Sequence, residues 1–154
     1  MKKESNNSID VRAMEQEDIL SVAQLERECF SVPWSADALK DSFEKDMYTF
    51  LVAVCKKMVI GYVGIYYIGG EGNITNIAVT QMWRSRGAAT MLLEYIFQDA
   101  AMRNCNEIFL EVRISNKKAI SLYQKMDFTI VGTRKKFYEK PVEDALILCK
   151  KLPL

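Results

Sequence analysis

The feature that most constrains this chain is a basic, small-residue segment between a strand-like run and an apolar, helix-like run. The strand-like run is NIAV at 76–79. The basic segment and the helix-like run that follows it are both contained in WRSRGAATMLLEYIF at 83–97. A helix N-terminus normally favours negative charge, because its free N–H groups carry a partial positive charge. Two arginines and little side-chain bulk at this point therefore predict that an anion from outside the chain binds where the helix begins.

A phosphate or pyrophosphate is the anion that suits this segment. Gly87 has no Cβ and lets the backbone approach a ligand closely, and Arg84 and Arg86 add positive charge. The candidate binding residues are Arg84, Ser85, Arg86, Gly87, Ala88, Ala89 and Thr90, with the helix body expected from about Thr90. On local composition alone, a solvated loop is an equally good interpretation. Neither GxGxxG nor GxxxxGK[ST] occurs, so NAD and ATP lack their usual sequence support.

Length and charge favour one soluble domain. The 154 residues are 49% hydrophobic, and we expect a flexible tail at 1–8 followed by a single domain at 9–154. The net charge of +1 favours neither nucleic acid nor a membrane surface as a partner. The start, MKKESNNSID, resembles neither a signal peptide nor an anchor, and no later run approaches the roughly 18 apolar residues of a membrane span. We therefore expect a cytoplasmic protein, as a monomer or weak homodimer.

The proton-transferring residues available to this chain are restricted, because it contains no histidine. His-based triads and most common metal sites are excluded, which leaves carboxylates, tyrosine and cysteine, and we expect no metal. The four cysteines are far apart, form no CxxC pair and have mostly apolar neighbours, so we expect reduced core thiols: Cys29, Cys55, Cys105 and Cys149.

The order of the expected elements indicates an α/β fold, more narrowly an α+β three-layer domain with a mixed sheet between helices. Strands are expected at 9–14, 48–55, 58–68, 73–81, 107–113, 127–138 and 143–151. Helices are expected at 16–29, after Ser35 as N-cap, from about 90, and at 116–126.

Two side chains in the last third of the chain are candidates for proton transfer. In EIFLEVR, the two-residue strand period places Glu111 on the face opposite Ile108 and Leu110. Tyr123 lies on one helical face with Ala119 and is also typical of a core aromatic. From the residues alone, a surface carboxylate and a core tyrosine are the simpler interpretations.

A resemblance to a known family decides between these interpretations. R-x-x-G-x-A at Arg84, Gly87 and Ala89, directly after NIAV, resembles the Q/R-x-x-G-x-G/A acyl-CoA motif of the GNAT superfamily of N-acetyltransferases. LEVRISNKKAISLYQKMDF resembles the second signature of that superfamily, in which a strand Glu, a helix-opening Asn and a helix Tyr precede a Phe. The resemblance covers about residues 9 to 152.

Within the superfamily, the chain is most similar to the RimI group, which acetylates the N-terminal alanine of a small-subunit ribosomal protein. The similar segments are VPWS at 32–35, NIAV, LEVRISN and RKKFY at 134–138. The resemblance therefore implies acetyl-CoA as co-substrate and a protein N-terminus, that of a ribosomal protein, as the acceptor.

The resemblance also implies roles for individual residues. Glu111 would be the general base that takes the proton of the attacking amine, and Tyr123 the acid that protonates the departing CoA thiolate. The backbone of Ile77, Ala78 and Val79 would pair with the pantetheine arm of CoA and polarise the thioester carbonyl, with Asn116 capping its helix and bonding the same arm. An apolar wall around a small N-terminal residue would be formed by Trp34, Phe137 and Tyr138.

One residue and one segment depart from the family pattern. Asp127 replaces the usual Gly before Phe128, where we expect a left-handed backbone that Asp tolerates, and the segment FYEKPVEDALIL is shorter than in the RimI group.

Two other functions stay open beside N-terminal acetylation. The alternatives are a GNAT enzyme for a small-molecule amine and a non-catalytic acyl-CoA-binding module. Acetyl transfer through a cysteine is disfavoured, because no histidine accompanies the thiols.

Overall fold

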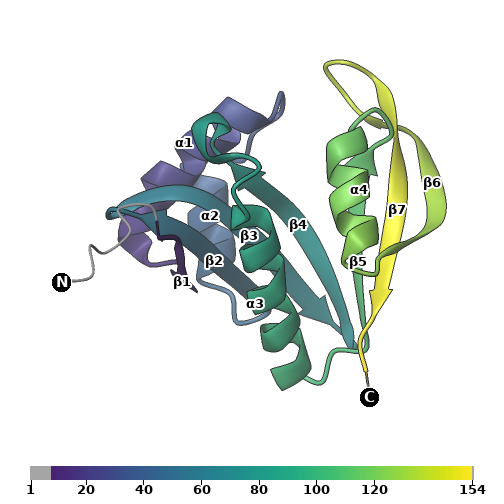
Figure 1. Ribbon diagram of the computed structural model, residues 1–154, viewed down its shortest axis with the longest axis horizontal. Coiled ribbons are helices and arrows are strands. Elements are labelled where there is room, and N and C mark those ends of the chain that lie inside the picture. Colours follow the sequence, from purple (N-terminus) through teal and green to yellow (C-terminus); the bar gives the residue numbers. More distant parts are fainter. Residues whose placement is uncertain (1–7, 154) are drawn as a thin grey trace.

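The computed structural model describes residues 8–153, so most of the expected tail at 1–8 and residue 154 lie outside the described residues. Within that range, one mixed sheet has the strand order β1-β2-β3-β4-β5-β7-β6, with helices on both faces (Figure 1). The strands are β1 (Asp10–Ala13), β2 (Tyr48–Cys55), β3 (Met58–Ile68), β4 (Glu71–Val79), β5 (Glu107–Arg113), β6 (Thr129–Tyr138) and β7 (Glu143–Lys151). The helices are α1 (Ile19–Cys29), α2 (Ala36–Phe43), α3 (Ala88–Met102) and α4 (Lys117–Lys125), with short 3-10 turns η1 (Gln16–Asp18) and η2 (Gln81–Trp83).

The sheet is divided in the middle, between β4 and β5. These two strands are the parallel pair, because α3 carries the chain from one to the other, and the remaining neighbours are antiparallel. Their pairing runs only from Glu71–Glu107 to Asn73–Phe109. Beyond that point the strands diverge, and Figure 1 shows two arms of the sheet that are joined at one end and separate toward the other.

Each face of the sheet has its own core. On one face, α3 and α4 pack over the aliphatic side chains of β3 and β5, such as Ile65, Ile108 and Leu110. On the other face, α1 and α2 pack over Phe50, Val52 and Tyr62. Strand β5 alternates between buried and half-buried residues, as the two-residue period predicts.

A β-bulge in β4 changes which residues face which helices. Gly64 pairs with Asn76 and Ile65 pairs with Ile74, so Thr75 is an extra residue in β4. A Cβ at Gly64 would lie 2.7 Å from the Thr75 hydroxyl and 2.7 Å from the Phe50 ring, so the bulge needs glycine opposite it. The extra residue reverses the alternation of the strand, which a strict two-residue period does not predict.

The starts of α2 and α4 agree with the local sequence signals, and the start of α3 differs by two residues. The Ser35 hydroxyl accepts from the Ala38 N–H at 3.1 Å, and the Asn116 side chain accepts from the Ala119 N–H at 3.2 Å, which confirms both caps. Helix α3 begins at Ala88 instead of the expected Thr90. The reason is that Gly87, at φ 87°, turns the chain directly into the helix.

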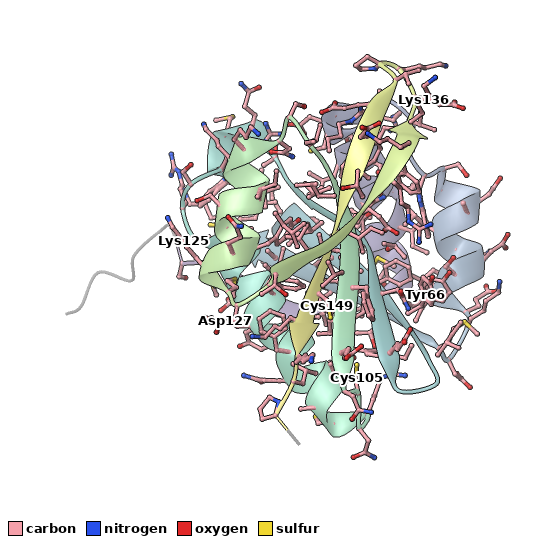
Figure 2. All side chains as sticks on the ribbon, turned by 90° about the vertical axis from the view of Figure 1, so that its right-hand side faces the viewer. Tyr66, Cys105, Lys125, Asp127, Lys136 and Cys149 are labelled. Carbon is pink, nitrogen blue, oxygen red and sulfur yellow. The ribbon has the colours of Figure 1, made fainter. Side chains whose placement is uncertain are left out.

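Several turns contain residues other than glycine with a positive φ. Asp127 has φ 69°, which confirms the expected left-handed conformation in the turn after Lys125 (Figure 2). The β2–β3 turn uses Lys56 and Lys57, both with positive φ. Cys105 and Cys149 (Figure 2) are buried, as is Cys55, whereas Cys29 is only half-buried, and within residues 8–153 no cysteine forms a disulfide.

Within residues 8–153, no helix is long and apolar enough to cross a membrane.

Candidate active site

Two cavities lie along the division between β4 and β5. The smaller, of about 480 Å³, is lined by both diverging strands, by the α1–α2 loop and by the end of β6. The larger, of about 880 Å³, is lined by the end of β4, the start of α3 and one face of α4. Residues common to both linings are Cys29, Phe30, Ile77, Asn116, Ala119 and Tyr123. The cavities therefore adjoin where α1, β4 and α4 come together.

The start of α3 forms one wall of the larger cavity. All the candidate phosphate-binding residues from Arg84 to Thr90 line it, except Arg86. A Cβ added at Gly87 would meet no protein atom within 4 Å, so the space in front of this residue is open to a ligand. The backbone N–H groups at the start of the helix lie beside that space and suit an anion.

The two arginines before α3 have different positions. Arg84 turns back onto the strand, where its Nε donates to the Val79 carbonyl at 3.0 Å and its guanidinium lies 3.5 Å from the Cys29 sulfur. The Arg86 guanidinium lies over the Trp83 ring, 5.0 Å from its centroid. Arg84 thus holds the loop to the end of β4 as well as adding charge.

Sequence reasoning missed the lysines opposite this wall. Lys117, Lys118 and Lys125 on α4 line the same cavity. Together with the start of α3 they surround the larger cavity with positive charge, which suits a polyanion. Their exposed positions on a helix gave no signal in the sequence, because a solvated helix face has the same composition.

The smaller cavity contains the expected aromatic residues. Trp34, Phe137 and Tyr138 all line it, and the rings of Phe137 and Tyr138 meet edge to face at 5.0 Å. Arg113 lies over the Tyr138 ring at 4.5 Å and donates to the Glu139 carbonyl at 2.9 Å. These contacts hold the end of β6 over the cavity.

Glu111 lines the smaller cavity from β5. Its carboxylate lies 3.3 Å from the Arg134 Nε, and its side chain is 32% exposed. It is therefore a partly exposed carboxylate, paired with Arg134, that a molecule in the cavity can reach. The negative charge of Glu111 adds to burial in raising the pKa of Tyr138 to about 12.

Tyr123 reaches both cavities from α4. Its side chain is buried, with its ring against Phe128 at 5.7 Å. Burial raises the pKa of the Tyr123 phenol far above its usual value, and the neighbouring Tyr138 contributes in the same direction. The phenol is therefore protonated at neutral pH and can donate a proton or hydrogen bond where the cavities adjoin.

The backbone of β4 beyond the bulge is the third element of the site. Ile77 lines both cavities, and Ala78 and Val79 line the larger one. Because β5 has diverged from this part of β4, its ladder groups on that side are available to a bound molecule. Asn116, which caps α4, also lines both cavities.

Sequence reasoning also missed a buried carboxyl beside the smaller cavity. Glu26 on α1 is fully buried and accepts hydrogen bonds from the Tyr62 hydroxyl and from the Asn76 amide. One signal was available: Glu26 follows the buried Val22 by four residues, so it lies on the apolar face of its helix. Within residues 8–153, no cluster of three His, Cys, Asp or Glu side chains could hold a metal ion.

Comparison with known proteins identifies the fold that carries this site. The model of the acetyltransferase (GNAT) family matches residues 19–128. The chain belongs to this family. A Bacillus subtilis protein, described as a candidate ribosomal-protein-bS18-alanine N-acetyltransferase, is 32% identical over 139 residues, 90% of this chain and 92% of that protein.

Solved structures of GNAT acetyltransferases have the same architecture. The Escherichia coli ribosomal-protein-S18-alanine N-acetyltransferase superposes with a TM-score of 0.88 at 23% identity, covering 96% of each chain. NAA60 of Arabidopsis thaliana in complex with acetyl-CoA gives 0.84 at 19% identity, covering 94% of this chain and 99% of that one. These likenesses confirm the expected GNAT fold. The family match confirms that the chain is a GNAT acetyltransferase, and the Bacillus subtilis relative confirms its similarity to the RimI group.

Proposed function

We propose that this GNAT acetyltransferase transfers the acetyl group of acetyl-CoA to the N-terminal α-amine of a protein. The supporting observation is that two cavities adjoin at Tyr123, one lined by the start of α3 and the other by Glu111. Acetyl-CoA would occupy the larger cavity and the peptide N-terminus the smaller one. Their reacting atoms would then meet beside the backbone of Ile77.

The larger cavity suits CoA from end to end. The amides of residues 85–90 would bind the pyrophosphate, with Gly87 allowing the close approach. The free backbone groups of Ile77, Ala78 and Val79 would pair with the pantetheine arm, with Asn116 at its other side. A backbone N–H on the thioester oxygen would stabilise the negative charge that develops there.

Transfer would proceed by direct attack of the amine. The amine nitrogen forms a bond to the thioester carbon, and the carbon–sulfur bond then breaks. Glu111 accepts the proton that the amine loses, and Tyr123 gives its proton to the departing thiolate, then regains one from solvent. The neutral phenol of Tyr123 supports its proposed role as the acid, and the partial exposure of Glu111 toward the smaller cavity supports its role as the base.

An α-amine is the acceptor that this chemistry favours. Its pKa of roughly 7.7 to 8 leaves a usable neutral fraction at pH 7, whereas a lysine amine at about 10.4 leaves far less. Trp34, Phe137 and Tyr138 give the smaller cavity an apolar wall that suits a small first residue such as alanine. A relative that is 32% identical is described as acting on a ribosomal protein. We therefore propose the N-terminal alanine of a small-subunit ribosomal protein as the acceptor. This substrate would place the reaction in the cytoplasm.

A turnover screen tests this proposal. Release of CoA from acetyl-CoA would be measured with short peptides that differ in the first residue, alongside polyamines, amino acids and other small amines. We expect the highest kcat/KM with peptides that begin with alanine or another small residue. Turnover of small amines alone would replace the peptide by a small-molecule substrate, and acetyl-CoA binding without any turnover would leave a non-catalytic binding module.

A further inference from the structure

A buried polar cluster lies on the α1 side of the smaller cavity, outside the residues that the proposed reaction uses. Its centre is Glu26, which is fully buried. One carboxyl oxygen, Oε1, accepts from the Tyr62 hydroxyl of β3 and from the Asn76 Nδ2 of β4, the latter at 2.6 Å. Burial raises the pKa of Glu26, and the hydrogen bonds from Tyr62 and Asn76, together with the nearby Trp34 N–H, oppose that change.

The cluster is not arranged for stability alone. The other carboxyl oxygen of Glu26, Oε2, is buried and has no hydrogen-bond partner within residues 8–153. A buried acceptor without a donor lowers the stability of the fold, and an apolar side chain of the same shape would avoid this cost. A buried carboxyl at this position therefore needs an explanation other than stability. Its hydrogen bond with Asn76 connects it to β4, one of the two diverging strands.

The bulge at Thr75 brings Asn76 into this cluster. Without the extra residue, the side chain at 76 would share the face of Ile74, which packs into the core beneath α3. With it, Asn76 turns toward α1 and lines the smaller cavity. A bulge that redirects one side chain at the edge of a cavity is typical of a functional position.

The hydrogen bond to Glu26 also sets which end of the Asn76 amide is free. Nδ2 donates to Glu26, so Oδ1 is the acceptor that the amide still offers. Within the described residues, Oδ1 accepts no hydrogen bond. The next residue, Ile77, lines both cavities, so Asn76 lies one position from where they adjoin.

We propose that the Asn76 carbonyl oxygen binds the acceptor amine, and that Glu26 and Tyr62 are positioning residues that hold the Asn76 amide for this contact. The inference rests on the proposed function, since it names a further residue for the same amine. A neutral acceptor suits this role, because it takes one N–H of the amine and leaves the lone pair directed at the thioester. A carboxylate in its place would stabilise the ammonium form, which cannot attack.

The first experiment is steady-state kinetics of Asn76→Ala with an alanine peptide, with Asn73→Ala as matched control. Asn73 is a half-buried residue of the same strand and does not line the cavity. Loss of one hydrogen bond to the amine should lower kcat/KM for the peptide about tenfold or more. The KM for acetyl-CoA should stay close to that of Asn73→Ala, whereas the unfolding temperature should fall below that of the control, because the buried Glu26 loses the Asn76 donor.

The second experiment tests the positioning residues by rescue and by coupling. Glu26→Leu removes the acceptor and should lower peptide kcat/KM, whereas Glu26→Gln keeps an acceptor oxygen and should recover most of it. In the Asn76→Ala background, Glu26→Leu should cause no further loss of activity, because it acts through the same amide. Acetyl-CoA binding by calorimetry verifies that each variant is folded.

The outcomes separate this inference from the proposed function. Peptide kcat/KM within twofold of wild type in a folded Asn76→Ala variant would overturn the inference and leave the proposed function intact. Additive losses for Glu26→Leu and Asn76→Ala would overturn the positioning role of Glu26. If the wild type acetylated only small amines, the same variants would be measured with the best amine, and if it acetylated none, both proposals would be wrong.

Discussion

At the residue scale, the two side chains proposed to transfer protons have opposite surroundings. Tyr123 is buried, and burial keeps its phenol protonated, whereas Glu111 is partly exposed beside Arg134. The burial of Tyr123 supports its proposed role as the acid, and the exposure of Glu111 its proposed role as the base. Each role leads to a separate kinetic prediction.

Replacing Tyr123 by Phe removes the hydroxyl and keeps the ring packing against Phe128. Loss of a general acid should lower kcat by about 10²-fold or more, with little change in thermal stability. The measurement is single-turnover acetylation of an alanine peptide, so that product release does not mask the chemical step. Wild-type rates in this assay would leave Tyr123 as core packing only.

Replacing Glu111 by Gln removes the carboxylate that we propose as the base and keeps the size of the side chain. Acetylation of the peptide should fall at pH 7 and recover partly as the pH rises through the α-amine pKa of about 8, where the substrate is neutral by itself. The pH profile of kcat/KM measures this, with acetyl-CoA affinity as the control that should not change. An equal loss at every pH would argue against a role in proton transfer.

At the scale of elements, the start of α3 is the proposed binding site for the pyrophosphate of CoA. Gly87→Val places a side chain in the open space of the larger cavity and should weaken CoA binding strongly, as measured by calorimetric titration. Gly69→Val is the matched control, because Gly69 also has a positive φ, at 58°, but lies in the β3–β4 turn. The two variants should lose similar stability, and equal CoA affinity in both would contradict the proposed pyrophosphate site.

The turn that leads into α1 provides a prediction on stability. The Asp18 carboxylate accepts from the Arg12 guanidinium at 2.6 Å and from the Glu15 N–H at 2.8 Å, and the Arg12 hydrogen bond lowers the pKa of Asp18. Asp18→Asn should therefore lower the free energy of unfolding at pH 7 by about 2 kcal/mol.

The pH dependence of that difference has a definite sign. A carboxyl whose folded-state pKa is lowered stabilises the fold above its unfolded pKa of about 3.9 and loses this effect as pH falls through the folded pKa. The gap between wild type and Asp18→Asn in urea unfolding should thus be full at pH 7 and shrink below about pH 4. A gap that stayed constant into strong acid would exclude the ion pair as its cause.

Local features of the site could be predicted from the sequence, because short-range contacts determine them. The Asn116 cap, the left-handed Asp127 and the buried alternation of β5 each depend on a few neighbouring residues. Glu26 and the bulge at Thr75 could not be predicted in the same way. Their surroundings come from strands and helices far apart in the chain, such as Tyr62 beside Glu26.

At the scale of the whole molecule, the divided sheet forms the two adjoining cavities in which we propose that the two substrates meet. The order of strands and helices was predictable from hydrophobic periodicity, and the family resemblance named the fold that this order matches. Residue periodicity did not predict the division between β4 and β5, because β5 keeps its alternation where the strands separate and the bulge at Thr75 reverses that of β4. Only the assembled sheet places Glu111 and the start of α3 on adjoining cavities.

The central claim is that the smaller cavity presents an α-amine, and no other amine, to the thioester. One peptide that carries both a free N-terminal alanine and an internal lysine tests it most directly. After partial reaction with acetyl-CoA, mass spectrometry would locate the acetyl group. We predict that it lies on the N-terminal amine, and that blocking that amine abolishes turnover. Acetylation of the lysine at an equal or faster rate would contradict the account.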